Sequence, residues 1–212
     1  MMNELKLCIL FLSLIGIFAF KPYGSEVELH TGDLLFRGAS TENISQAIDK
    51  VTQTSAATHF SHVGIVEVLD SGIFVLHASP VGGTCEVPIY QFLHPEGDSV
   101  IVVAYRLKDK WHAAIPEAIK KAKQMLGKPY NFSYIMTDTA HYCSEFVYLA
   151  FVADSVFELN PMTFKDPKIG NFFPTWIEYY KKMGLEIPEG LPGCNPNGLA
   201  ASFKLERLGI VN

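Results

Sequence analysis

Three short segments carry side chains that could act together in nucleophilic catalysis. They are FSHVGIV (Phe60–Val66), FVLHASP (Phe74–Pro80) and HYCSEFVYLAF (His141–Phe151). Each segment places an imidazole or a thiol at the edge of an apolar stretch, where packing can fix its position. A cysteine beside a histidine becomes a nucleophile because the imidazole takes the thiol proton. The three segments therefore predict a Cys–His site built on two strands and a helix.

The two histidines belong to a predicted β-hairpin. Residues 61–69 and 73–78 alternate and are rich in β-branched side chains, and Asp70-Ser71-Gly72 between them is typical of a turn. If Val68 faces Ile73, then His62 and His77 are diagonal neighbours on one face, about 7–8 Å apart at the backbone. A slip of one residue would place them on opposite faces, so the expectation depends on this register.

Cys143 is predicted at the start of a helix that begins near residue 142 and runs to about residue 153. Asp138 or Thr139 would serve as its cap, which places Cys143 in the first turn. The free amides and the positive end of the helix dipole there favour a thiolate and can hold an oxyanion. A neighbouring histidine would lower the thiol pKa further.

Each of these residues also has an ordinary structural interpretation. A lone histidine on a strand is more often a hydrogen-bonded core residue, and a lone cysteine is more often a small buried hydrophobe. Three tyrosines near the cysteine segment are either pocket walls or core aromatics, with core favoured for two of them: Tyr130, Tyr134 and Tyr142. The other histidines are expected on the surface or in loops, although His59 and His141 are close enough in sequence to line the site.

The remaining elements point to an α+β fold, in which helices flank a run of antiparallel strands. Further strands are expected at 32–37 and 99–106, and further helices at 40–52, 113–126 and 175–183. Residues 161–196 are rich in proline and are expected to form surface loops around one short helix.

Composition limits the class of protein. The chain has 212 residues, of which 49% are hydrophobic and 18% charged, enough to build one domain with a full core. The net charge is −5, and lysine and arginine form no run. Nucleic-acid binding is therefore not expected, because its affinity comes largely from basic side chains on phosphates.

The N-terminal stretch predicts export. Residues 7–20 carry no charge but are too few to span a bilayer as a helix. They are typical of the apolar core of a signal peptide. The sequence therefore predicts a cleaved signal peptide over 1–24, with an uncleaved anchor as the alternative. It also predicts a single domain over 25–212, no transmembrane domain after cleavage, and a location in the periplasm or cell envelope.

The cysteines are consistent with one reactive thiol. Without the leader, which contains Cys8, three remain: Cys85, Cys143 and Cys194. An odd number in an oxidising compartment leaves at least one unpaired. Whether Cys85 and Cys194 pair stays open, because sequence does not give disulfide geometry.

Four motifs, in this order, resemble a known family: GDLLFR (Gly32–Arg37), SHVGIV (Ser61–Val66), GKPYNFSY (Gly127–Tyr134) and YCSEFVYLAF (Tyr142–Phe151). They are similar to the YiiX/YebB-like branch of permuted papain-fold, NlpC-type cysteine hydrolases, over roughly residues 28–155. The resemblance implies a circularly permuted papain-like fold, with an antiparallel sheet or half-barrel flanked by helices. It also implies the catalytic order histidine, polar residue, cysteine.

On this resemblance Cys143 would be the nucleophile, His62 its general base and acid, and His77 the residue that orients the His62 ring. Many relatives have an acid in the pattern E-A where this chain has His77-Ala78. The two carboxylates nearest the site in sequence are poor substitutes for this acid. Glu67 points to the other face of its strand, and Glu145 lies round the helix from Cys143, where a structural role is expected.

The expected function is an exported cysteine hydrolase that cleaves an amide or ester through an acyl-enzyme, without cofactor or metal. Its substrate would be a peptide, a peptidoglycan fragment, or a lipid or acyl amide. Two alternatives remain open. One is a catalytically weak papain-fold module that only binds a ligand. The other is a zinc-dependent hydrolase that uses His62, His77 and Cys143 as ligands.

Overall fold

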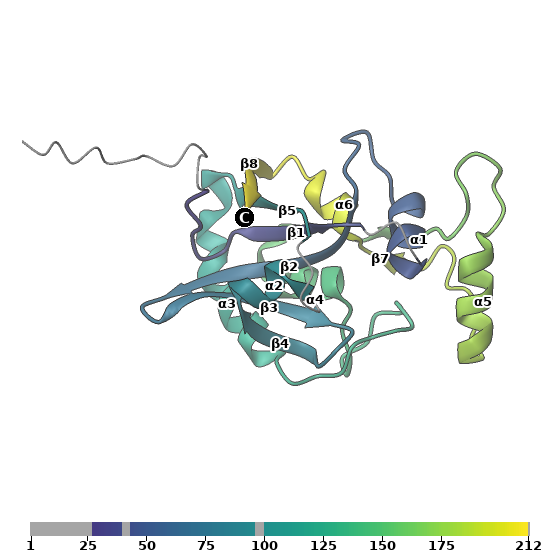
Figure 1. Ribbon diagram of the computed structural model, residues 1–212, viewed down its shortest axis with the longest axis horizontal. Helices are drawn as coiled ribbons and strands as arrows, with labels where there is room; N and C mark the ends of the chain where they lie inside the picture. Colours follow the sequence, from purple (N-terminus) through teal and green to yellow (C-terminus); the bar gives the residue numbers. More distant parts are fainter. Residues whose placement is uncertain (1–26, 40–42, 96–99, 212) are drawn as a thin grey trace, which may run out of the picture.

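A six-stranded antiparallel sheet organises the chain. The computed structural model describes residues 27–39, 43–95 and 100–211, so the predicted signal peptide lies outside the described part. The strand order is β4-β3-β2-β1-β5-β8 (Figure 1). The strands are β1 (Leu34–Gly38), β2 (Phe60–Leu69), β3 (Gly72–Ser79), β4 (Gly83–Pro88), β5 (Val102–Leu107) and β8 (Leu205–Val211).

Helices flank this sheet, which confirms the predicted α+β class. They are α1 (Asn43–Val51), α2 (Ile89–Leu93), α3 (Ile115–Gln124), α4 (Cys143–Ala150), α5 (Pro174–Met183) and α6 (Pro196–Ala200), with 3₁₀ turns η2 (Asp109–Ala114) and η3 (Val152–Asp154). A small second ladder joins β6 (Asn160–Pro161) to β7 (Pro192–Gly193). Within the described residues, none of the helices combines the length and the apolar composition that a membrane span requires.

The two faces of the sheet bury different side chains, because successive strand residues alternate between faces. On one face Ile65 and Leu76 join a cluster with Phe146 of α4. On the other face Val66 and Val75 pack with Phe92 of α2. The alternation decides on which face each candidate site residue lies.

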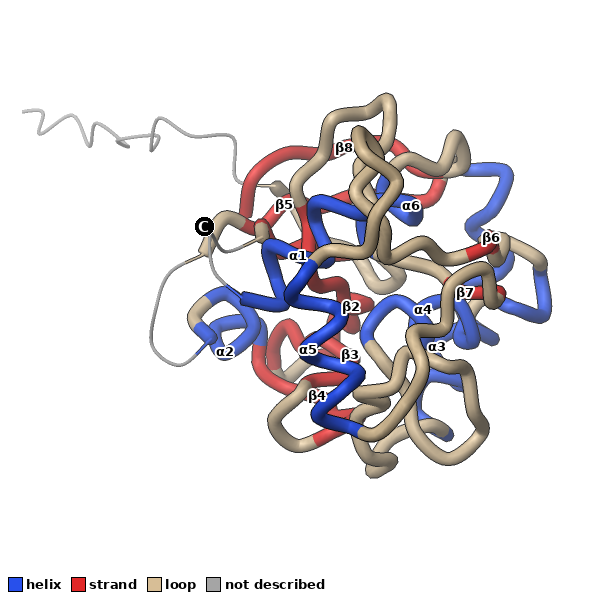
Figure 2. The backbone as a smooth tube through the Cα atoms, turned by 90° about the vertical axis from the view of Figure 1, so that its right-hand side faces the viewer, coloured by secondary structure: helices blue, strands red, loops and turns tan. Residues whose placement is uncertain are grey.

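A third cluster joins α1 to α5, away from the sheet. Trp176 and Tyr180 of α5 are buried with Ala47 of α1 and with Phe164. Figure 1 shows α1 between the sheet and α5, and the two helices also lie side by side in Figure 2. The proline-rich segment forms loops around α5, as the sequence predicts.

Several elements differ from the expectation. The predicted helix over 113–126 is a 3₁₀ turn followed by the shorter α3. The short elements β4, α2, α6 and β8 were not predicted. The strand expected over 99–106 begins only at Val102 in the described residues, which exclude 96–99.

Candidate active site

The predicted hairpin has the expected register. Val68 faces Ile73, and the paired ladder runs as far as Ile65 opposite Leu76. Beyond that pair β2 remains paired with β1 and β3 with β4, but β2 and β3 no longer pair with each other. The candidate residues lie at this open end of the hairpin.

His62 and His77 lie together, as the register predicts. The His62 Nε2 and His77 Nδ1 atoms are 2.8 Å apart, and both side chains are buried. Both rings pack on Phe92, with ring centroids 5.6 Å and 5.2 Å from it. Gly64 leaves room for them, because a Cβ there would lie 3.1 Å from His77 Cβ and 2.5 Å from Val75 Cγ1. The absence of a side chain at Gly64 therefore allows the His77 side chain to pack in this position.

Cys143 is the first residue of α4 and reaches the open end of the hairpin. Its Sγ lies 4.0 Å from the carbonyl oxygen of Ser61, and the Val63 amide hydrogen-bonds to its sulfur. These two groups flank His62 on the backbone of β2. The structure thus brings His62 and His77 together and places the Cys143 thiol against the backbone on either side of His62, directed to Ser61 rather than to an imidazole nitrogen.

The start of α4 differs from the prediction in its cap. The N-cap residue is Tyr142, not Asp138 or Thr139. The Glu145 carboxylate accepts the Tyr142 amide hydrogen at 3.1 Å, which is one half of a capping box. Glu145 also accepts hydrogen bonds from the Thr137 amide and Asn131 Nδ2, at 3.2 Å and 3.3 Å. Its predicted structural role is confirmed.

The thiol pKa differs in direction from the expectation. Burial raises the pKa of Cys143 to about 11, and this outweighs the amides of Val63 and Ser144 and the charge of Arg37, which lower it. Burial, together with Arg37, lowers the pKa of His77 to about 3 and holds that of His62 well below its usual value. The free site is therefore a neutral thiol beside neutral imidazoles.

Arg37 is a site residue that the sequence analysis missed. It pairs with His62 across β1 and β2, and its Cζ lies 4.9 Å from the centre of the Phe92 ring. Its charge acts on Cys143, His62 and His77. Within the described residues no carboxylate lies within ion-pair distance of it. The sequence does contain a signal for this role, because Arg37 is the last residue of the GDLLFR motif.

A cavity of 530 Å³ opens beside the thiol, with Cys143 and Ser61 in its wall. Tyr130, Tyr134 and Tyr142 all line it. All three also belong to the main core: Tyr142 is buried in it, and Tyr130 and Tyr134 pack against it. The two interpretations therefore both hold for these side chains.

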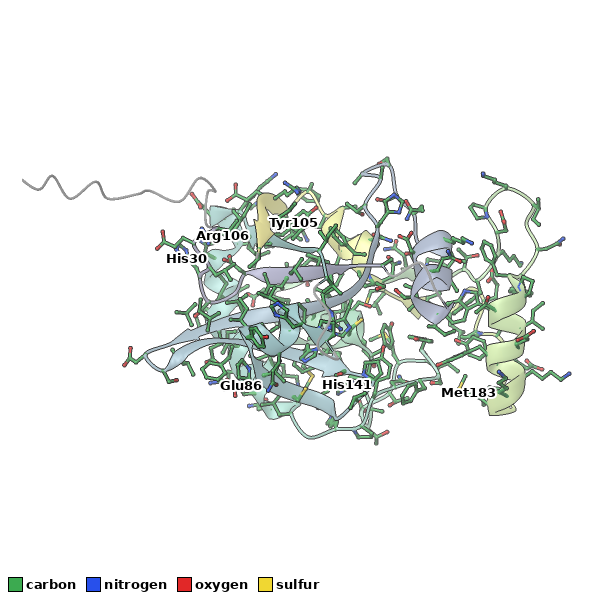
Figure 3. The ribbon with its side chains drawn as sticks, viewed as in Figure 1. His30, Glu86, Tyr105, Arg106, His141 and Met183 are labelled. Carbon is green, nitrogen blue, oxygen red and sulfur yellow. The ribbon has the colours of Figure 1, made fainter. Side chains whose placement is uncertain are left out.

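Other candidates lie away from the thiol. His59 is exposed and contacts Asp49 at 2.9 Å, whereas His141, labelled in Figure 3, is buried with its Nδ1 3.5 Å from Glu145 Oε1. Neither histidine lines the cavity. Glu67 pairs with Lys123 at 2.6 Å, remote from the imidazoles as expected.

The structure also bears on the other two cysteines and on the zinc alternative. Cys85 and Cys194 are free thiols, so they do not pair in this structure. Among the residues described, no group of three or more His, Cys, Asp or Glu side chains is arranged to hold a metal ion.

A cysteine at a helix N-terminus, set against a strand-borne histidine and a second polar residue on the next strand, defines the class of papain-like cysteine hydrolases. Residues 28–209 match the family described as permuted papain-like amidase enzymes, YaeF/YiiX, C92 family. The chain belongs to this family, whose description supports a cysteine hydrolase kind of function.

Two similar proteins carry the name YiiX. The uncharacterized protein YiiX of Escherichia coli (strain K12) is 30% identical over 149 residues, which are 70% of this chain and 66% of that protein. A crystal structure described as metalloprotein yiiX from Escherichia coli O157:H7 matches with a TM-score of 0.64 and 25% identity. That match covers 85% of this chain and 96% of the solved chain.

Proposed function

We propose that the protein is a cysteine hydrolase that cleaves an amide or ester bond through an acyl-enzyme on Cys143. The observation that carries the proposal is the His62–His77 contact of 2.8 Å at the open end of the hairpin, where Cys143 lies against the backbone on both sides of His62. His62 is the general base and acid, and His77 is its positioning residue.

The contact between the two rings determines their proton positions in this proposal. A ring nitrogen of His62 with a free lone pair must accept the thiol proton. Nε2 does not meet this condition, because it hydrogen-bonds to His77. Its Nδ1 is therefore the base, and its proton resides on Nε2, which donates to His77 Nδ1. His77 then carries its own proton on Nε2 and acts as the acceptor that holds the His62 ring in place.

In the first half of the reaction, the Cys143 proton moves to His62 Nδ1 as Sγ bonds to the substrate carbonyl carbon. The tetrahedral intermediate collapses with cleavage of the bond to the leaving group, which takes the proton from His62. In the second half, a water molecule gives a proton to His62 and attacks the acyl carbon. The sulfur then leaves and recovers its proton.

Backbone amides near Cys143 would stabilise the oxyanion. The amides of Cys143 and Ser144 at the start of α4, and that of Val63 on β2, already hydrogen-bond to the sulfur. Fixed donors of this kind are worth about 10²–10³-fold in kcat when aimed at an oxyanion. The same amides explain how Cys143 can react although burial raises its pKa. Negative charge develops only after the substrate is bound, and the amides then stabilise that charge.

The substrate classes in this proposal are a cell-wall peptide and a lipid or acyl amide, and the site of action is the periplasm or cell envelope. The export part is supported by the uncharged stretch at 7–20. The family is described as amidase enzymes, which supports an amide as the bond that the protein cleaves.

The proposal is tested by hydrolysis of a panel of p-nitroanilides and p-nitrophenyl esters by the wild type, Cys143→Ala and His62→Ala. Cys85→Ser is the matched thiol control: Cys85 is a free thiol outside the cavity, and although it pairs with His77 across β3 and β4, the change replaces only sulfur by oxygen. Loss of at least about 10³-fold in kcat/KM is expected for Cys143→Ala and of about 10²-fold or more for His62→Ala, with Cys85→Ser close to the wild type. Rates at background in both the wild type and Cys143→Ala would support the ligand-binding module, and loss of wild-type activity on chelation would support the zinc alternative.

A further inference from the structure

Arg37 places a positive charge beside the proposed general base. It pairs with His62 across β1 and β2, so both side chains extend from the same face of the sheet. Its Cζ lies 4.9 Å from the centre of the Phe92 ring. Within the described residues, no carboxylate or other acceptor receives a hydrogen bond from the guanidinium. Its five N–H donors are therefore available to a ligand.

The guanidinium is also accessible from outside. Arg37 is partly exposed, whereas His62 and His77 are buried. None of these three residues is in the wall of the cavity beside Cys143. A ligand of Arg37 would therefore lie outside that cavity, on the side of the imidazoles.

The proposed reaction brings the leaving group to this side. His62 protonates the leaving group as it departs, so the leaving group must come within hydrogen-bond distance of the His62 ring. Directly opposed residues on antiparallel strands have Cβ atoms about 4.5–5.5 Å apart. A leaving group that contacts His62 is therefore within reach of the long side chain of Arg37.

An anion at this position would balance the charges of the site. The proposed reaction places a second positive charge on His62, next to that of Arg37, and the neutral His77 does not offset it. After burial, the charge of Arg37 is the next cause that lowers the pKa of both imidazoles. A negative group bound to the guanidinium would offset this charge and make proton transfer to His62 more favourable.

The shape of the guanidinium selects the kind of anion. A planar guanidinium donates two parallel hydrogen bonds to the oxygens of a carboxylate or a phosphate. We infer that Arg37 binds an anionic oxygen group of this kind, a carboxylate or a phosphate, on the leaving group of the substrate. This inference rests on the proposed function of Cys143. Arg37 is then a specificity residue, and the substrates are amides or esters whose departing part carries negative charge.

The test uses three aryl acetates that differ only in the substituent para to the ester oxygen: 4-acetoxybenzoate, 4-acetoxyphenyl phosphate and the neutral 4-acetoxybenzamide. All three give the same acetyl-enzyme on Cys143, so kcat/KM compares only the acylation step. The rate with Cys143→Ala is subtracted from each. The anion preference is kcat/KM for an anionic ester divided by kcat/KM for the benzamide. Differences between the phenols as leaving groups cancel when this ratio is compared between variants.

Arg37→Gln should reduce the anion preference by about tenfold or more, the worth of a hydrogen bond to a charged group. Division by the benzamide value removes the effect of Arg37 on the thiol, which applies to all three esters. Arg37→Lys keeps the charge but loses the paired donors, so its preference should lie between those of Arg37→Gln and the wild type. Arg207→Gln is the matched control, because Arg207 is exposed on β8 and the change in net charge is the same. It should leave the preference unchanged.

The outcomes separate the two claims. If Cys143 hydrolyses the benzamide ester but Arg37→Gln keeps the anion preference of the wild type, the inference is wrong and the proposed function stands. Equal decreases in Arg37→Gln and Arg207→Gln would also overturn the inference, because the effect would then come from net charge alone. A decrease for only the benzoate or only the phosphate supports the inference and identifies the anion that the site accepts. If no ester acetylates Cys143, the proposed function fails, and the inference fails with it.

Discussion

The Nε2 atom of His62 and the Nδ1 atom of His77 lie 2.8 Å apart in a site where burial, together with the charge of Arg37, lowers the pKa of both rings. Two neutral imidazoles at this distance must divide the roles of donor and acceptor. His77, the third residue of the site, is therefore a neutral hydrogen-bond acceptor. A carboxylate in the same position would accept the same hydrogen bond but would also carry a negative charge. His62 is positioned by this contact without a charge to stabilise its protonated form.

The acceptor role of His77 leads to the first prediction. His77→Gln keeps a side-chain oxygen that can accept from His62, and kcat should stay within about tenfold of the wild type. His77→Leu removes the acceptor, and kcat should fall by about 10²-fold, in line with the loss of general-base geometry. Steady-state kinetics at several pH values measure both variants, and equal activity of the two would show that His77 does not position His62.

Arg37 provides the second prediction. Its charge lowers the pKa of the Cys143 thiol. Arg37→Gln should therefore slow alkylation of Cys143 by iodoacetamide at pH 8 by roughly tenfold, since only the thiolate reacts. Arg37→Lys keeps the charge and should retain most of the rate. Mass spectrometry of the Cys143 peptide gives the rate, and faster alkylation in the glutamine variant would contradict the proposed effect.

The buried imidazoles predict a loss of stability in acid. The unfolded chain takes up protons on histidine near pH 6.5, whereas folding lowers the pKa of His77 to about 3 and also lowers that of His62. The stability contributed by His77 is then complete above pH 6.5 and is lost as the pH falls toward 3, by about 1.4 kcal/mol per pH unit; the lowered pKa of His62 adds a loss in the same direction.

Urea unfolding at pH 7, 5.5 and 4 measures this loss. The double variant His62→Gln/His77→Gln should show a smaller decrease of the unfolding free energy over the same range, because the unfolded chain then takes up fewer protons. An identical decrease in the double variant and the wild type would mean that these rings do not control the acid stability.

Gly64 gives a prediction that combines packing and activity. A Cβ at this position would lie 2.5 Å from Val75 Cγ1 and 3.1 Å from His77 Cβ. Gly64→Ala should destabilise the fold by about 1–3 kcal/mol and lower activity by displacing His77. Gly38→Ala is the control, because its closest approach would be an ordinary 3.4 Å. Thermal unfolding and kcat/KM of both variants check this, and a fully active, stable Gly64→Ala would contradict it.

The hairpin and its two histidines could be predicted because their signals are local. Alternation and a turn at 70–72 determine the register, and the register alone places His62 beside His77. The position of Cys143 at the start of α4 was also predictable from the helical pattern that follows it. These relationships depend on residues close together in the sequence.

The rest depends on contacts between distant segments. Arg37 reaches the site because β1 pairs with β2, a register that no local pattern reveals. The raised pKa of Cys143 follows from burial by α4 and β2, which sequence does not measure. The cavity wall combines α1 with segments after residue 155, so its apolar character could be recognised only once these were brought together.

The most direct test of the central claim is intact-mass analysis of the protein after rapid acid quench of its reaction with p-nitrophenyl octanoate. The account predicts one octanoyl adduct, located on Cys143 by peptide mapping and formed together with a burst of p-nitrophenol. The adduct should be absent in Cys143→Ala, slow in His62→Ala, and unchanged in Cys85→Ser. Turnover of the ester with no acyl adduct on Cys143, or with the same rate in Cys143→Ala, would contradict the account.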